Sequence, residues 1–169
     1  MKRVAEFKKV SLKQFEKDWQ NVFGETKNIN EIYLKIELPK RATAFSAGYD
    51  FFSPISFTLK PNQTINIPTG VRCEIANNFV LQIFPRSGLG FKFRLQLNNT
   101  VGIIDSDYFH SDNEGHIHIK LTNATNENKT VEINQGQGIA QGVFLEYGIT
   151  IDDNATATRN GGFGSTTKA

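Results

Sequence analysis

Residues 80–97 read VLQIFPRSGLGFKFRLQL, an apolar run followed by a turn and a second β-type run. The first run extends from Val80 to Phe84, and the second from Phe91 to Leu97. A proline and two glycines mark the turn at residues 85–90. Runs of this length bounded by proline and glycine are typical of strands, so the stretch predicts two strands joined by a turn.

The same pattern continues on both sides of this stretch, from Ile32 onward. Turn signals such as Lys60-Pro61-Asn62 separate further short β-type runs, and no internal repeat is present. The expected strands are Ile32–Leu38, Phe51–Leu59, Thr64–Ile67, Val80–Phe84, Phe91–Leu97, His116–Leu121, Thr130–Ile133 and Ile139–Glu146. Many short strands of this kind predict an all-β fold, either a sandwich or a barrel.

The residues before this β-type region predict one short helix. Residues 11–14, SLKQ, fit a capping box, and Gly24 supplies a stop signal. Between them, Leu12, Phe15, Trp19 and Val22 form an apolar stripe at helical spacing. We therefore expect an N-terminal extension with an amphipathic helix over residues 1–30, a β-barrel domain over 31–155 and a mobile, glycine-rich arm over 156–169.

Composition limits the function classes. The chain has 169 residues, enough for one domain with a sizeable core. Its formal net charge of +2 is too small, and its basic residues are too scattered, to indicate nucleic-acid binding. No apolar run is long enough to span a membrane, and no secretory segment is evident near the start. The single Cys73 cannot form an internal disulfide, which indicates either a reducing cytoplasm or merely an unneeded thiol. Taken together, these features lead us to expect a cytoplasmic protein with neither nucleic acid nor membrane as a partner.

The turn at residues 85–90 carries groups that bind anions. Arg86 supplies a planar guanidinium that matches phosphate, and Ser87 and the amide of Gly88 supply further donors. No glycine-lysine-serine sequence follows, and no strand-to-helix alternation surrounds the turn, so neither a Walker loop nor a Rossmann loop is indicated. Taken alone, these residues are more typical of an ordinary surface turn.

Residues 97–108, LNNTVGIIDSDY, predict a ligand pocket. Alternation along an extended run places Asn99, Ile103 and Asp105 on one face, and Gly102 permits a bend or the close approach of a ligand. In such a pocket a carboxamide and main-chain groups can read a base edge, and Asp105 can hold a water. The ring of Tyr108 can press on a sugar.

The segment at residues 159–167, RNGGFGSTT, combines one aromatic ring with a glycine-rich backbone, an arginine and hydroxyls. Glycine loses more conformational freedom on ordering than any other residue, so we expect this segment to be mobile until a ligand orders it. Phe163 can stack on a base, while Arg159, Ser165 and Thr166 can reach phosphate oxygens. A disordered tail is the alternative for this segment considered alone.

Together, these segments resemble the motifs of the trimeric dUTP diphosphatase (dUTPase) family. Five motifs occur in the family's order and span most of the chain: Ala47-Gly48-Tyr49-Asp50, Pro85-Arg86-Ser87-Gly88-Leu89-Gly90, Gly102-Ile103-Ile104-Asp105-Ser106-Asp107-Tyr108, Gly138-Ile139-Ala140-Gln141 and Gly161-Gly162-Phe163-Gly164-Ser165. The resemblance implies a distorted jelly-roll β-barrel, assembled as a homotrimer with three shared active sites. It also implies hydrolysis of dUTP to dUMP and pyrophosphate by attack of water on the α-phosphorus, which keeps uracil out of DNA and supplies dUMP for thymidylate synthesis.

The resemblance further implies a role for each motif residue. Asp105 would orient and polarise the attacking water, and Asp50 would help to organise the site. The phosphates would be held by Arg86, Ser87, Gly88, Arg159, Ser165 and Thr166, with Gln141 contributed by the neighbouring subunit. Uracil and deoxyribose would be bound by Asn99, Gly102, Ile103, Ile104, Tyr108 and Phe163. In that set Tyr108 would exclude a 2′-hydroxyl, and Phe163 would close over the base.

Metal binding by the protein itself is not expected. In the family that the chain resembles, Mg²⁺ is the cofactor but is carried by the triphosphate and keeps its waters. Asp105 and Asp107 share a strand face, but the glycine and glutamate that a calcium loop requires are missing. His116 and His118 form a His-x-His pair, which could bind zinc with a third ligand. No third ligand is evident in the sequence, so we expect a structural role for this pair.

Some features depart from the family pattern. Gly138 stands where many members carry an arginine, so one phosphate contact or intersubunit pairing is absent or replaced. The turn at residues 109–114 is longer than usual, and the tail has one residue fewer between Arg159 and the Gly-Gly-Phe segment. The family does not account for the N-terminal helix. Core packing is the default expectation for its stripe, and the helix could also contact another subunit or a partner.

Two rival functions come from other classes. Related deoxycytidine triphosphate deaminases share the barrel and an Arg-Ser turn, but deamination needs a glutamate in the pocket, and Glu74, Glu114 and Glu132 lack that context. A regulatory protein that senses dUTP or engages a repressor, as some phage-borne relatives do, could coexist with catalysis. An intact Asp105 argues against a purely binding protein. The resemblance therefore implies dUTP as the ligand, with a regulatory protein partner if the protein is phage-borne.

Overall fold

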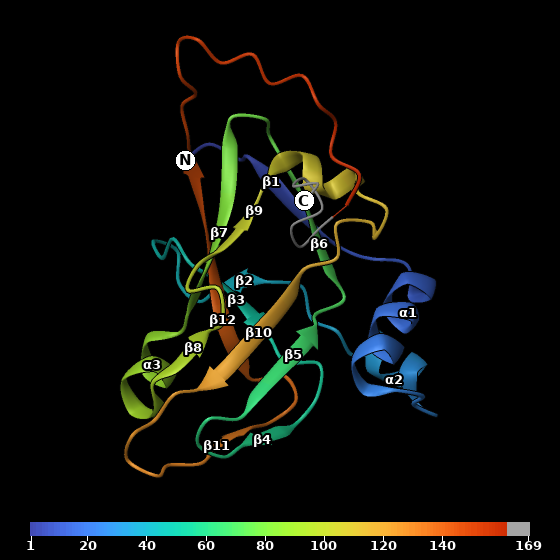
Figure 1. Ribbon diagram of the computed structural model, residues 1–169, viewed down its shortest axis with the longest axis vertical. Coiled ribbons are helices and arrows are strands. Elements are labelled where there is room, and N and C mark those ends of the chain that lie inside the picture. Colours follow the sequence, from blue (N-terminus) through green and yellow to red (C-terminus); the bar gives the residue numbers. More distant parts are fainter. Residues whose placement is uncertain (162–169) are drawn as a thin grey trace.

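The computed structural model describes residues 1–161, and these residues are mostly β (Figure 1). The strands are β1 (Ala5–Lys9), β2 (Lys40–Arg41), β3 (Tyr49–Phe52), β4 (Phe57–Leu59), β5 (Thr64–Pro68), β6 (Val71–Ile75), β7 (Phe79–Pro85), β8 (Leu95–Leu97), β9 (Gly102–Ile104), β10 (His118–Asn123), β11 (Val131–Ile133) and β12 (Gly138–Glu146). The helices are α1 (Leu12–Phe23), α2 (Ile29–Leu34), α3 (Ser87–Phe93) and the 3₁₀ helix η1 (Ser106–His110). None of these helices has the length and apolar content needed to cross a membrane. The predicted all-β class is confirmed.

A central sheet and three smaller sheets carry the fold. The central sheet has the strand order β2-β3-β12-β7-β9, and its two long strands, β7 and β12, pair antiparallel at its centre. The smaller sheets are β5-β10-β8, β1-β6 and β4-β11. Within residues 1–161 the hydrogen bonding is therefore divided among four sheets and does not close into one continuous barrel.

The core lies between these sheets. Ile67 on β5, Leu81 on β7, Leu121 on β10 and Ile139 on β12 are all fully buried in one cluster. Each such side chain contributes roughly 1.5–3 kcal/mol when it leaves water. The sheets are held together by this shared apolar contact.

The N-terminal segment belongs to the same core. Strand β1 pairs antiparallel with β6, with Phe7 opposite Cys73. Helix α1 then buries Phe15 and Trp19 in the main cluster, at 0% and 3% exposure. Core packing of the helical stripe is thus observed, while the division of the chain at residues 30 and 155 stays a prediction.

Helix α1 has the two ends that the sequence indicated, but its cap is completed from elsewhere. Ser11 Oγ accepts a hydrogen bond from the amide of Gln14 at 3.1 Å, and Gly24 ends the helix with a φ of 76°. The amide of Ser11 donates to Glu114 Oε2 at 2.7 Å, whereas the side chain of Gln14 donates to Asp18. Half of the capping box is therefore local, and the other half comes from a distant loop.

The strand expected at Ile32–Leu38 is wrong, because this region begins with helix α2. The apolar residues Ile29, Ile32, Tyr33 and Ile36 recur at the i, i+3, i+4 and i+7 positions of one helical face. All four pack on the core cluster, and Tyr33 lies against Phe15 of α1. The β-branched composition of the segment suggested a strand, but the spacing of its apolar residues is helical.

Two other expected strands differ from the structure. Residues expected to begin the strand Phe91–Leu97 instead complete α3, and Arg94, with a φ of 54°, ends that helix before β8. The run Phe51–Leu59 is divided into β3 and β4 around Pro54, which cannot donate to a strand ladder. Strands β1 and β6 carried no sequence signal that we recognised.

Candidate active site

A cavity of about 310 Å³ lies beside β9. Its lining includes Asn99, Gly102, Ile103, Ile104 and Tyr108, which are the residues predicted to bind base and sugar within residues 1–161. Strand β9 is held in place by β7, with Gly102 opposite Ile83. The structure therefore brings these predicted residues together at one hollow, which we call the nucleoside pocket.

Gly102 sets how closely β9 approaches β7 at this pocket. A Cβ atom at position 102 would lie 3.2 Å from Ile83 Cβ and 3.9 Å from Asn99 Nδ2. The first distance is tighter than ordinary van der Waals contact. A larger residue would therefore push against the strand partner and crowd the carboxamide of Asn99.

Tyr108 presents its ring to the pocket because its hydroxyl is engaged elsewhere. The hydroxyl donates to the carbonyl of His116 at 2.8 Å and accepts from Asn113 Nδ2 at 2.8 Å. The residue is 6% exposed, and burial raises the pKa of its phenol. These contacts fix the ring as an apolar surface, which suits the predicted packing under a sugar.

Asp105 follows β9 directly and lies at the start of η1. Its Oδ2 lies 2.5 Å from Nη2 of Arg159, and Asp107 Oδ1 lies 2.9 Å from Nε of the same guanidinium. The Asp105 side chain is 46% exposed, and it lines a second hollow of about 620 Å³ together with Asp107 and Arg159. The carboxylate is thus open to solvent on one side and neutralised on the other.

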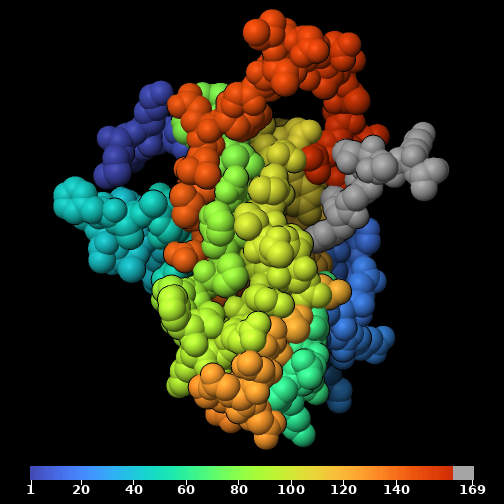
Figure 2. All heavy atoms as spheres, turned by 60° about the vertical axis from the view of Figure 1, so that its left-hand side comes forward, coloured from blue at the N-terminus to red at the C-terminus, as the bar shows by residue number. Residues whose placement is uncertain are grey.

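Arg159 reaches this position along an extended arm. After β12 the described residues 147–161 form neither helix nor strand, and they arch away from the body before returning to η1 (Figure 2). Arg159 was predicted to hold outer phosphates, and here it pairs with the carboxylates of Asp105 and Asp107 instead. The other predicted tail residues, Phe163, Ser165 and Thr166, lie outside the described residues.

A second group of predicted residues forms around Arg86, where β7 gives way to α3. Arg86 Nε lies 3.2 Å from Asp50 Oδ1, and its Nη1 lies 3.3 Å from the carbonyl oxygen of Gly138. Gln141, opposite Asp50 in the sheet, donates from Nε2 to the carbonyl of Pro85 at 3.2 Å. Three predicted residues from three strands or strand ends therefore meet at this point, which we call the arginine cluster.

Two glycines make room for the arginine cluster. A Cβ atom at Gly138 would lie 2.6 Å from Arg86 Nη1, and one at Gly48 would lie 2.7 Å from Gln141 Oε1. A side chain at position 138, where the family pattern has an arginine, would therefore displace the Arg86 guanidinium from its present position. Ser87 and Gly88 begin α3, and the space around the Gly88 Cα is open.

The arginine cluster and Asp105 lie toward opposite ends of β7. Ile104 pairs with Leu81 near the start of β7, whereas Arg86 follows the last residue of that strand. At ~3.3 Å per residue, the backbones of Asp105 and Arg86 are separated by roughly 15–20 Å. Figure 1 shows the same separation, with α3 after Arg86 at one end of β7 and the yellow η1 near the other. One chain therefore does not bring the two groups together.

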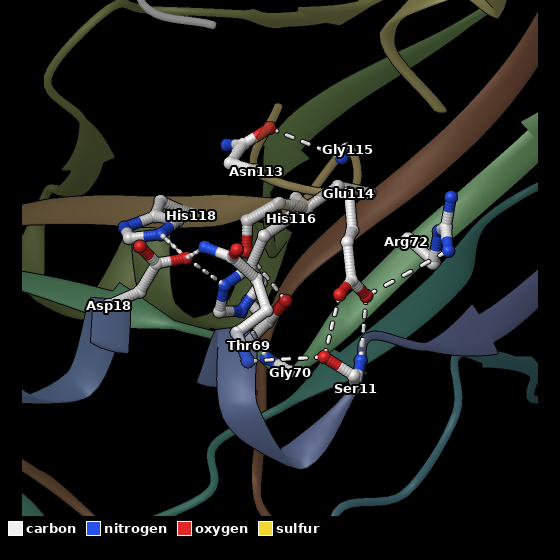
Figure 3. Close-up of polar contacts among 12 residues, drawn as sticks. Ser11, Asp18, Thr69, Gly70, Arg72, Asn113, Glu114, Gly115, His116 and His118 are labelled. Carbon is white, nitrogen blue, oxygen red and sulfur yellow. Dashed lines mark hydrogen bonds and ion pairs between the residues drawn. The ribbon is translucent and has the colours of Figure 1, made fainter. Parts of the chain in front are cut away.

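Sequence reasoning missed one polar group beside the nucleoside pocket. His118 lines the pocket, and it lies close to His116 and to Asp18 of α1 (Figure 3). The His-x-His pattern drew attention to the pair, but the partner from α1 could not be identified without knowing how that helix docks. Arg159 was identified, but its pairing with Asp105 and Asp107 was not.

Comparison with known proteins gives a consistent match. The dUTPase family model matches residues 34–167. The chain is 38% identical over 134 residues to a deoxyuridine 5′-triphosphate nucleotidohydrolase from Lactococcus lactis subsp. lactis, covering 78% of this chain and 88% of that protein. It is 41% identical over 139 residues to a protein of the same name from Haemophilus influenzae, covering 78% of this chain and 87% of that one.

Solved structures agree with the sequence matches. The crystal structure of dUTPase from Streptococcus mutans matches with a TM-score of 0.63 and 32% identity, covering 87% of this chain and 98% of that one. A dUTPase variant of Staphylococcus bacteriophage 80alpha with dUpNHpp matches with a TM-score of 0.64, covering 94% of this chain and 100% of that one. At 20% identity, the phage match concerns the fold alone.

Proposed function

Because the chain belongs to the dUTPase family, we propose that it hydrolyses dUTP to dUMP and pyrophosphate. In this reaction water attacks the α-phosphorus. The bond that breaks is the one between the α-phosphorus and the oxygen that joins it to the β-phosphate. The product dUMP is available for thymidylate synthesis, and removal of dUTP keeps uracil out of DNA. The proposed compartment is the cytoplasm, which suits a buried free cysteine at position 73.

The observation that carries this proposal is the position of Asp105 at the end of the strand that lines the nucleoside pocket. A carboxylate beside the sugar end of a bound nucleotide can orient a water toward the α-phosphate and accept its proton. Arg159 pairs with that carboxylate. An incoming triphosphate competes for the guanidinium, which frees Asp105 as the phosphates arrive.

The nucleoside pocket supports selection of deoxyuridine. The carboxamide of Asn99 and the main chain of Ile103 and Ile104 supply donors and acceptors for the uracil edge. The proposed pocket has too little room for a methyl group on the base, as the family pattern implies. The ring of Tyr108, fixed through its hydroxyl, packs under deoxyribose and disfavours a 2′-hydroxyl.

The phosphate groups require residues from more than one copy of the chain. Arg86, with Ser87, Gly88 and Gln141, supplies the donors for phosphate, and Asp50 orients the guanidinium. Since Arg86 and Asp105 of one chain lie roughly 15–20 Å apart, the arginine cluster of one copy serves the nucleoside pocket of another. The proposed assembly is a homotrimer with three shared sites, and the tail residues Arg159, Phe163, Ser165 and Thr166 complete each site.

Mg²⁺ is the proposed cofactor, carried by the triphosphate. A variant dUTPase from phage phi11 is described with a coordinated structural Mg(II) ion. Among residues 1–161 the one cluster of three potential metal-ligating side chains is Asp18, His116 and His118, which lacks the oxygen-rich character that Mg²⁺ prefers. Asp50 is paired with Arg86. The side chains of residues 1–161 therefore fit a Mg²⁺ ion that is held by phosphate oxygens and water. The ion would neutralise part of the phosphate charge.

The test is a product analysis of the purified full chain. The protein is incubated with Mg²⁺ and, separately, dUTP, dCTP, dTTP and UTP, and the products are separated by chromatography. Conversion of dUTP alone to dUMP and pyrophosphate is the expected result. A deoxyuridine nucleotide formed from dCTP would instead indicate a deaminase, and the absence of turnover with every nucleotide would leave a binding protein.

A further inference from the structure

Two segments that the family pattern leaves unexplained, helix α1 and the long turn at residues 109–114, bind each other. Glu114 accepts hydrogen bonds from the amide and the hydroxyl of Ser11 at 2.7 and 2.6 Å (Figure 3). Burial raises the pKa of Glu114, but the hydrogen bonds from Ser11 outweigh this effect and hold the pKa below its usual value. Glu114 is therefore charged at neutral pH and caps the first turn of α1, where negative charge is favourable.

The same helix makes a second polar contact further along its length. Asp18 Oδ2 lies 2.6 Å from His116 Nδ1 and 3.6 Å from His118 Nε2. Gln14, one turn earlier, donates to the same oxygen at 2.8 Å. Figure 3 shows the carboxylate of Asp18 directed toward both imidazole rings, while Ser11 and Glu114 meet at the other end of the group.

The hydrogen bonds determine the protonation of His116. The amide of Gly70 donates to His116 Nε2 at 2.8 Å, so this nitrogen carries a lone pair. Nδ1 then carries the proton and donates it to Asp18. Burial lowers the pKa of His116, and this effect outweighs that of Asp18, so the ring is neutral at pH 7. A neutral imidazole of fixed tautomer links helix α1 to the β-sheets.

These contacts also argue against a metal at this position. The ligand atoms of Asp18, His116 and His118 lie within 4.8 Å of one another, which is a spacing that a transition metal could bridge. A metal on Nδ1 of His116 would need the lone pair of that nitrogen while the amide of Gly70 uses the lone pair of Nε2. A neutral imidazole has only one such pair, so a hydrogen-bonded group fits the geometry better.

Asp18 and His116 are connected to the nucleoside pocket through two residues, His118 and Tyr108. His118, two residues further along, lines the pocket, and its side chain is 9% exposed. The carbonyl of His116 accepts the hydroxyl of Tyr108, whose ring forms another wall. His118 Nδ1 also lies 3.4 Å from Asn66 Nδ2 on the adjacent strand. Movement of α1 away from His116 would therefore displace two walls of the pocket.

We propose that Asp18 is a positioning residue for nucleoside recognition, acting through His116 and His118, and that His118 is a further wall of the deoxyuridine site. The inference rests on the proposed function, because it takes dUTP as the ligand. The N-terminal helix and the turn at residues 109–114 then act as one brace behind the pocket. The brace contacts the nucleoside end of the site and leaves the arginine cluster untouched.

The test separates the two ends of the substrate. Asp18→Asn keeps the shape of the side chain but replaces the carboxylate, which accepts the hydrogen bond from His116, with a neutral amide. We expect KM for dUTP and Kd for dUMP to rise roughly tenfold, with kcat within about threefold of wild type. The inhibition constant of pyrophosphate, which binds only at the phosphate end, is expected to stay unchanged. Glu16→Gln, on the same helix, is the matched control and is expected to match wild type in all four values.

A second variant covers the case in which Asp18→Asn fails to fold. His118→Gln removes the ring from the pocket wall but leaves the contact between Asp18 and His116, and it should raise the Kd for dUMP by a similar factor. His118→Asn, which keeps a shorter polar group near the Nδ1 position, is expected to recover part of that loss. Wild-type values of KM for dUTP and Kd for dUMP in folded Asp18→Asn, or in His118→Gln, would overturn the proposal.

The readouts distinguish failure of this inference from failure of the proposed function. If the wild-type chain binds dUMP but does not hydrolyse dUTP, the function is wrong, while the Kd values still decide the role of Asp18. Addition of one equivalent of Zn²⁺ tests the hydrogen-bonded arrangement directly. We expect no change in Tm, and a saturable rise at one ion per chain that Asp18→Asn abolishes would replace the brace with a metal site.

Discussion

Arg159 Nη2 and Asp105 Oδ2 lie 2.5 Å apart, so the proposed catalytic carboxylate is paired with an arginine. The guanidinium also contacts Asp107. In the proposed reaction, the triphosphate competes for this guanidinium and frees Asp105.

Asp105→Asn is expected to retain nucleotide binding and to lose turnover by roughly 100-fold or more, because the amide cannot accept the proton of the attacking water. The measurement is kcat with dUTP beside Kd with a non-hydrolysable analogue. Asp107→Asn, which removes the other carboxylate on Arg159, is the matched control and should stay within about tenfold of wild type. Unchanged turnover in Asp105→Asn would remove the proposed base.

Gly138→Ala is expected to raise KM for dUTP by roughly tenfold, because the new methyl group displaces the guanidinium of Arg86 from Asp50 and weakens a charge-assisted phosphate contact. Steady-state kinetics at fixed Mg²⁺ provide the measurement. Gly148→Ala, at a position with open space around it, is the control and should behave as wild type. If KM stayed at the wild-type value in Gly138→Ala, the position of the Arg86 guanidinium beside Asp50 would not determine binding of dUTP.

Mixing two inactive variants is expected to restore activity, because Asp105 and Arg86 come from different copies in each proposed site. Asp105→Asn and Arg86→Gln chains are unfolded together and refolded at equal concentration. In a randomly mixed trimer, the chance that a site combines intact Asp105 with intact Arg86 is one half times one half, so roughly a quarter of wild-type activity should return. Each variant refolded alone is the control. A mixture as inactive as its components would show that the sites are not shared.

Acid is expected to weaken the fold through His116. The pKa of this buried ring is lowered in the folded protein, so the unfolded chain takes up a proton that the folded chain refuses. Its contribution to stability is complete above the ordinary value of 6.5 and falls as the pH drops below it. The loss is at most about 1.4 kcal/mol per pH unit until the folded pKa is reached.

The charged groups around His116 act in a different pH range. Asp18 and Glu114 both have lowered pKa values, so their contributions are present above the usual carboxyl range and are lost only at lower pH. The ring of His118 is the other titratable group that contacts His116. Urea unfolding between pH 5 and 8 is the measurement. His116→Gln should flatten the slope below pH 6.5, whereas His110→Gln, at an exposed position, should not; equal slopes in wild type and His116→Gln would contradict this account.

The sequence predicted those parts of the fold in which local pattern and tertiary packing agree. Strands β5, β7 and β12 appear where apolar runs indicated them, and α1 has the ends expected from Ser11 and Gly24. Helix α2 was not predicted, because its β-branched isoleucines favour a strand although the spacing of its apolar residues is helical. Helix α3 was missed because its glycines and aromatic residues have low helix propensity, and its conformation depends on the surrounding fold.

The sequence likewise predicted those parts of the candidate site that lie close together in the chain, and it did not predict the contacts between distant segments. The residues of the nucleoside pocket are near one another in sequence, so the single segment 97–108 was enough to group Asn99, Ile103 and Tyr108. The extended run expected from Asn99 to Asp105 is wrong, because Thr100 has a φ of 62° and the strand covers only Gly102–Ile104. The contact between Asp18 and His116 joins positions 98 residues apart and depends on how α1 docks, which no local pattern specifies. The pairing of Arg159 with Asp105 likewise depends on the path of the arm after β12.

The cap that Glu114 provides for Ser11 has a consequence for the order in which the protein becomes structured during synthesis. Helix α1 is translated before the carboxylate that accepts from the amide of Ser11 at its start, because Glu114 follows 103 residues later. A helix of 12 residues is marginal in water on its own. The β1 strand before it also waits for β6. Strand β1 and helix α1 therefore lack their partners until β6 and the turn at residues 109–114 have been synthesised, and until then they are exposed to chaperones and proteases.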